Sequence, residues 1–130
     1  LYHVDTFERC IWAFDKYPDG SITNRRKFLQ LEKQEDGFPD GLTVDNENRV
    51  WLAHWGGSRI SCFSPSGEII GKVEMPVPQI TSCTFGGKNL STLYITTASR
   101  NIDLEKFPQA GSLFRVNTKT TGSASPYFGG

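Results

Sequence analysis

The sequence lacks long apolar runs and lacks an excess of charge of either sign. Its apolar stretches are only a few residues long, whereas a helix that crosses a bilayer needs about 20 apolar residues. The 14 basic and 14 acidic residues give a formal net charge of zero. This balance provides no electrostatic reason to bind nucleic acid or an anionic lipid surface. We therefore expect neither nucleic acid nor a membrane among the partners of this protein.

Cysteine and histidine are both scarce. The three cysteines, Cys10, Cys62 and Cys83, are odd in number and far apart, and none belongs to a C-x-x-C pair. We interpret them as buried free thiols of a protein in a reducing, cytoplasmic compartment. A reactive cysteine would need a histidine partner, and only His3 and His54 are available.

Several catalytic motifs are absent. There is no G-x-S-x-G elbow, which disfavours a Ser-His-Asp hydrolase. There is no G-x-x-x-x-G-K-[ST] or G-x-G-x-x-G loop, which disfavours nucleotide enzymes. A convincing helical period is also missing, and residues 25–36 fit a strand running into a polar loop at least as well as a helix.

What the sequence does contain is a repeat of short alternating runs. The 13 glycines and 7 prolines fall between these runs, which is typical of an all-β protein. Each repeat has the order strand, strand, turn, strand, and aromatic residues match across the copies at Tyr2, Trp51 and Tyr94. In this order, the segments of the first copy are 1–4, 10–15, 18–20 and 27–31. Those of the second copy are 50–54, 59–64, 65–67 and 69–73, and those of the third are 93–97, 112–116, 121–122 and 125–128.

A period of about 40 to 50 residues with four short strands per unit predicts a β-propeller. The segments 41–44 and 81–85 would be innermost strands, whereas the first copy begins at its second strand. The chain is thus expected to hold about two and three-quarter blades: 1–37 (incomplete), 38–80 and 81–130. Since a closed propeller needs at least about four blades, we expect N-terminal blades to be missing, or several copies to form one ring.

The segment Pro39-Asp40-Gly41 contains the clearest candidate for a functional residue. Proline restricts the backbone around it, and glycine permits another segment to approach closely. Asp40 would therefore sit on a stiff corner before an inner strand. A surface turn is the alternative, because Pro-Asp-Gly is common turn chemistry.

Four segments resemble the senescence marker protein/gluconolactonase/regucalcin-like family: PDGLTVD at 39–45, VWLAHWGG at 50–57, PVPQITSCTFGG at 76–87 and LYITTAS at 93–99. The resemblance implies the C-terminal part of a six-bladed propeller with one divalent cation at the mouth of its channel. Calcium is the first expectation, with zinc, magnesium or manganese as alternatives. The family's ligands are a glutamate, two asparagines and the aspartate of the PDG motif, and only the aspartate can be transferred, to Asp40. The other ligands are expected upstream of Leu1.

The resemblance implies a metal-dependent hydrolase of sugar lactones, with Asp40 as metal ligand and as the catalytic base. Thr81 and Ser82 begin the next inner strand and are candidates for substrate contact, with hydrogen bonds of their hydroxyls to the backbone as the favoured alternative. We expect the chain to be inactive alone, because it lacks the other ligands. Its expected partners are a small lactone and the missing blades or another copy of the chain. The alternative function is a non-catalytic propeller that binds calcium or a partner.

Overall fold

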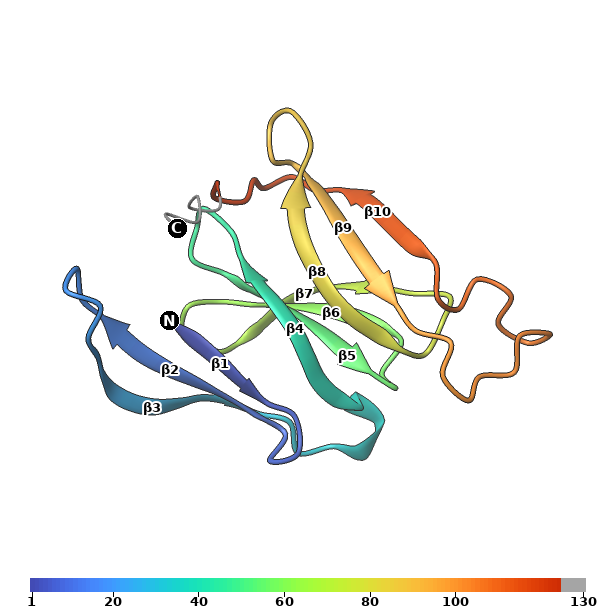
Figure 1. Ribbon diagram of the computed structural model, residues 1–130, viewed down its shortest axis with the longest axis horizontal. Helices are drawn as coiled ribbons and strands as arrows, with labels where there is room; N and C mark the ends of the chain where they lie inside the picture. Colours follow the sequence, from blue (N-terminus) through green and yellow to red (C-terminus); the bar gives the residue numbers. More distant parts are fainter. Residues whose placement is uncertain (125–130) are drawn as a thin grey trace.

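The computed structural model describes residues 1–124 (Figure 1). The described residues form ten β-strands and one short 3-10 helix. Their bounds are β1 Tyr2–Asp5, β2 Cys10–Lys16, β3 Ile22–Gln30, η1 Gln34–Asp36, β4 Phe38–Val44, β5 Val50–Trp55, β6 Arg59–Phe63, β7 Ile69–Glu74, β8 Ile80–Gly86, β9 Thr92–Thr97 and β10 Leu113–Asn117. In this part of the chain there is no helix that is long and apolar enough to cross a membrane.

The strands pair in sequence order into three antiparallel sheets. The first sheet has the order β1-β2-β3, the second β4-β5-β6-β7 and the third β8-β9-β10. The sheets are arranged as successive blades, and β4, the first strand of the middle blade, lies between β1 and β8 (Figure 1). The architecture is therefore all-β and of the propeller type, as the repeat predicted.

The hydrophobic core lies between the blades, in two clusters. The middle and third blades share the larger one, and the first and middle blades share the other. Both faces of the middle blade are consequently covered, and Leu52, Ala53 and Ile60 are fully buried. Trp51 of β5 packs edge-on against Phe85 of β8, with ring centroids 5.7 Å apart. This contact confirms that a repeated aromatic position packs between blades.

Two strands begin earlier than the sequence indicated. The outer strand of the first blade begins at Ile22 rather than near Lys27, and β4 begins at Phe38 rather than Gly41. Residues 25–36 are strand and then a single 3-10 turn, and not an α-helix. The expected strand 125–128 lies outside the described residues, and the blade boundaries proposed above stay predictions.

Candidate functional site

Asp40 lies at an irregularity inside β4. Pro39 and Leu42 pair with His54 and Leu52 of β5, so two residues of β4 stand opposite one residue of β5. This is a β-bulge, which bends a strand and redirects a side chain locally. The sequence analysis placed Asp40 on a corner before the inner strand. The structure instead places it within the strand, at the bulge that the proline and glycine flank.

The carboxylate of Asp40 is half-buried and accepts no hydrogen bond from any side chain of the described residues. Burial raises its pKa above the ordinary value, against a smaller opposing effect of the Gly41 backbone amide. Removing a carboxylate partly from water without pairing it costs free energy. A carboxylate kept in this state is therefore a candidate for binding a cation or a proton.

A hollow of about 420 Å³ opens beside Asp40. It is lined by Thr6, Phe7, Phe38, Asp40, Trp55 and Arg100. Thr6 and Phe7 come from the β1–β2 turn, Trp55 ends β5, and Arg100 follows β9, so all three blades contribute to the lining. Phe38 and Trp55 are directly opposite one another in the β4–β5 pair. Their side chains consequently emerge on the same face of the sheet.

Among the residues of this hollow, the sequence analysis identified only Asp40. Phe38 and Trp55 could have been found from the sequence, because each directly precedes a motif rich in Pro or Gly: Phe38 precedes PDG and Trp55 precedes GG. Phe7 and Arg100 lie in loops of separate blades. Their sequence positions contained no information that would bring them together.

Thr81 and Ser82 lie on β8, next to β4, but outside the lining of this hollow. The Thr81 hydroxyl is 2.7 Å from the Thr96 hydroxyl, with which it shares a hydrogen bond. Ser82 packs so closely against Gly41 that a Cβ atom at position 41 would lie 2.2 Å from the Ser82 Oγ. Contact of either residue with a substrate stays a prediction.

Asp40 fits a divalent cation as one ligand, because it is a hard oxygen donor that pairs with no other side chain of residues 1–124. Within residues 1–124, however, no cluster of three or more His, Cys, Asp or Glu side chains could hold a metal ion. Calcium in proteins has about six to eight oxygen ligands. The described residues therefore supply one donor of such a site and leave the rest of the coordination to other groups.

A second carboxylate, Asp45, lies at the other end of β4 and is only 2% exposed. It accepts hydrogen bonds from the Arg49 Nε at 2.7 Å and the Trp51 Nε1 at 2.9 Å, and from the backbone amides of Glu47 and Arg49. Burial alone would raise its pKa, but these hydrogen bonds outweigh burial and lower it. Since all of its acceptor capacity is used, Asp45 is a structural residue and not a free ligand.

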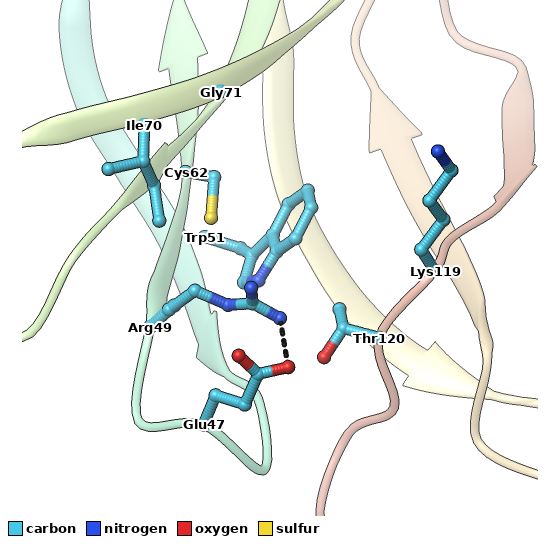
Figure 2. Close-up of a pocket in the computed structure, with 8 residues that line it drawn as sticks. All are labelled: Glu47, Arg49, Trp51, Cys62, Ile70, Gly71, Lys119 and Thr120. Carbon is cyan, nitrogen blue, oxygen red and sulfur yellow. Dashed lines mark hydrogen bonds and ion pairs between the residues drawn. The ribbon is translucent and has the colours of Figure 1, made fainter.

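A cavity of about 360 Å³ lies next to this end of the middle blade. Unlike Asp40, its arginine is already paired with carboxylates. Figure 2 shows Arg49 paired with Glu47 at its edge, with Lys119 and Thr120 of the third blade opposite. The Arg49–Glu47 distance is 2.9 Å. The arginine of this cavity is thus already paired with two carboxylates, those of Asp45 and Glu47.

His54 is also fully buried. Its Nδ1 is 2.8 Å from the backbone carbonyl oxygen of Asp36, which accepts the ring proton. Burial lowers the pKa of His54, so the ring is held neutral. The Asp36 carboxylate in turn pairs with Arg59. These contacts fasten the η1 turn to β5 and β6. The buried Nε2 of His54, by contrast, has no hydrogen-bond partner among the described residues.

The comparisons with known proteins extend over most of the chain. The family model described as "SMP-30/Gluconolactonase/LRE-like region" matches residues 1–99. Regucalcin from Homo sapiens is 37% identical over 132 aligned positions, which include 98% of this chain and 44% of regucalcin. The chain thus spans less than half the length of the curated relatives it matches.

Two solved structures are similar in both fold and sequence. A luciferin-regenerating enzyme is 35% identical with a TM-score of 0.82, and the match covers 95% of this chain and 43% of that enzyme. Regucalcin from Agrobacterium tumefaciens, described as a calcium-binding protein, is 25% identical with a TM-score of 0.88. That match covers 96% of this chain and 44% of the other.

Proposed function

Since the chain belongs to the SMP-30/gluconolactonase/LRE-like family, we propose that it forms part of a metal-dependent hydrolase of lactones, with Asp40 at the reacting centre. The observation that carries the proposal is the half-buried Asp40 carboxylate, which has a raised pKa and no side-chain partner in the described residues and which faces a hollow lined by three blades. The same position is the one that the PDG motif identifies.

Asp40 has two oxygens and can serve two purposes. One oxygen can hold a divalent cation, for which calcium is the first candidate and zinc, magnesium or manganese are alternatives. When bound, such a cation polarises the lactone carbonyl and lowers the pKa of a bound water. The other oxygen can take the proton of the attacking water, so that Asp40 acts as a general base.

Hydrolysis then needs no covalent intermediate on the protein. The water oxygen bonds to the carbonyl carbon while its proton moves to Asp40. The ring C–O bond breaks, and the leaving oxygen takes up the proton that Asp40 received, which restores the carboxylate and gives an open hydroxy acid. In this scheme the rigid bulge of β4 serves to hold Asp40 in place, since a positioned base is worth far more than a mobile one.

The chain supplies one ligand of the proposed site, so its metal affinity and its activity alone should be low. Calorimetric titration of the chain with calcium and with zinc tests this expectation. Tight, saturable one-site binding by the monomeric chain would contradict it.

The function itself is tested by Asp40→Asn in the full-length protein that contains this chain. We expect loss of lactone hydrolysis and weaker calcium binding together, because one carboxylate would serve both. Asp19→Asn is the matched control, since Asp19 is an exposed turn residue that accepts hydrogen bonds from Ser21. Retained hydrolysis in Asp40→Asn would refute the role of Asp40. Calcium binding without hydrolysis of any lactone by the unmodified protein would favour the alternative, a non-catalytic calcium- or partner-binding propeller.

A further inference from the structure

A different hollow, of about 320 Å³, lies between the first and the middle blade. The end of β3 and the segment after it form one side, and β5, β6 and the start of β7 form the other. Asp40 is not among its lining residues. This inter-blade hollow is therefore separate from the one beside Asp40.

His54 brings a buried hydrogen-bond acceptor to the inter-blade hollow. It is fully buried and belongs to the lining. Its Nδ1 donates to the backbone carbonyl oxygen of Asp36, so in the neutral ring the other nitrogen, Nε2, is an acceptor. This buried Nε2 has no hydrogen-bond partner among the described residues. An unpaired buried acceptor costs free energy, and a hydrogen-bond donor that entered the hollow would recover it.

Ser61 of β6 brings a buried donor to the same hollow. It is fully buried, and its Oγ accepts a hydrogen bond of 3.2 Å from the Arg59 Nε. Its own hydroxyl proton has no acceptor among the side-chain hydrogen bonds of residues 1–124.

The pairing of β5 with β6 makes His54 and Ser61 neighbours. His54 stands opposite Arg59, two residues before Ser61. Ser61 is thus the diagonal neighbour of His54 on the same face of the sheet, and such neighbours are about 7–8 Å apart. One hydroxyl group placed between them can donate to His54 and accept from Ser61, because a hydroxyl is both donor and acceptor.

The charged side chains of the inter-blade hollow leave one positive charge unpaired. They are Lys33, Asp36 and Arg59. Asp36 and Arg59 pair with each other. Lys33 is exposed and forms no ion pair within the described part of the chain. An ammonium group in this position favours an anionic group of a ligand.

The size of the hollow suits a small organic molecule. Water occupies about 30 Å³ per molecule in the liquid, and small-molecule sites begin at about 300 Å³. At about 320 Å³, the hollow has room for much more than one water and is at the lower end of the range for ligands. The buried Leu31 and Phe63 also line it and suit a short carbon skeleton.

From these features we propose that the inter-blade hollow binds a small hydroxycarboxylate, whose hydroxyl group bridges His54 and Ser61 and whose carboxylate pairs with Lys33. This site goes beyond the proposed function, because it does not contain Asp40 and needs neither a lactone nor a divalent cation.

The test titrates the full-length protein that contains this chain with 3-hydroxybutyrate and follows the NMR shift of the His54 Nε2 nitrogen. We expect a saturable upfield shift, because this nitrogen gains a hydrogen bond when the ligand binds. Butyrate lacks the hydroxyl group and should leave the resonance in place. The diol 1,3-butanediol lacks the carboxylate and should shift the resonance only at higher concentrations.

Substitutions locate the ligand by calorimetry. His54→Asn removes Nε2 but keeps a side-chain N–H for the Asp36 carbonyl oxygen, and it should weaken binding of 3-hydroxybutyrate about tenfold. Ser61→Ala should weaken it by a similar factor, since the ligand hydroxyl loses its donor.

Lys33→Gln is the variant that is safe for folding, because the side chain is exposed. It should weaken binding about two- to fivefold and reduce its dependence on salt, as expected for an exposed ion pair. Lys88→Gln is the matched control and should leave the affinity unchanged, because Lys88 is an exposed lysine between β8 and β9 that does not line the hollow.

Each outcome decides the inference. An upfield shift at His54, with binding weakened by Ser61→Ala and Lys33→Gln, supports the site. Absence of saturable binding means that only water fills the hollow, and it overturns the inference. Binding that both substitutions leave unchanged, or that Asp40→Asn removes while His54→Asn retains it, places the ligand elsewhere and also overturns it.

Discussion

Gly41 of β4 lies in close contact with Ser82 of β8, beside the proposed site. A Cβ atom at this position would be 2.2 Å from the Ser82 Oγ, 2.5 Å from its Cβ and 2.8 Å from its Cα. All three distances are shorter than van der Waals contact, and the Cα belongs to the backbone, which cannot rotate away. We therefore expect Gly41→Ala to lower the free energy of unfolding by about 1–3 kcal/mol, the usual cost of overpacking a close contact.

Gly71→Ala is the matched control within the same blade. A Cβ there would be 3.8 Å from the Cys62 Cβ, an ordinary contact, and Gly71 lies in the exposed strand β7. This change should alter stability by no more than about 0.5 kcal/mol. Urea unfolding of the two variants measures the difference directly.

The clash can be relieved only in part. Ser82→Gly removes the Oγ and Cβ atoms from the contact and leaves the Cα at 2.8 Å. A double-mutant cycle of Gly41→Ala and Ser82→Gly should consequently give a coupling of about 1 kcal/mol in favour of the double variant. Equal stability of Gly41→Ala and Gly71→Ala, together with no coupling, would refute the close approach of β4 and β8.

Three further predictions concern buried groups. Asp45→Asn should lower the free energy of unfolding by about 3 kcal/mol or more, because buried donors lose a charged acceptor. Asp15→Asn, at an exposed ion pair, is the control and should have a much smaller effect. The lowered pKa of Asp45 means that its contribution is present near neutral pH and is lost as the pH falls through the acid range, which pH-dependent urea unfolding would detect. Burial lowers the pKa of His54, so below about pH 6.5 its imidazole is protonated in the unfolded chain but stays neutral in the folded protein. The free energy of unfolding should therefore fall as the pH drops through this range, and His54→Asn should remove this part of the pH dependence. Burial raises the pKa of Cys62 to about 11 and of Cys83 to about 12, so iodoacetamide at pH 8 should label them only after unfolding; rapid labelling of the folded protein would contradict their burial.

Much of the fold followed from local pattern. The short runs between glycine and proline, with apolar residues at alternate positions, were sufficient to predict strands, and their recurrence predicted blades. Within residues 1–124, sheet pairing confirms the order of these strands. Strand starts were less certain, since the outer strand β3 is mostly exposed and carries no alternation from which its beginning at Ile22 could be read.

The site was predictable only at its centre. Pro39 and Gly41 flank Asp40 in sequence and act on the backbone directly beside it, so the motif made Asp40 a candidate, and the family resemblance then favoured a site residue over a surface turn. Its place inside a bulge was not predictable, because a bulge depends on how β4 and β5 pair.

The sequence by itself determined the strand pattern, its repetition and the choice of Asp40 as a candidate, because each can be read from local runs of residues. The tertiary structure alone decided that Phe7, Phe38, Trp55 and Arg100 surround that carboxylate. It also distinguished two aspartates of the same strand: Asp45 is saturated by hydrogen bonds, while Asp40 is left without a side-chain partner. Burial and pairing depend on which blades meet in space, and a linear pattern does not contain that information.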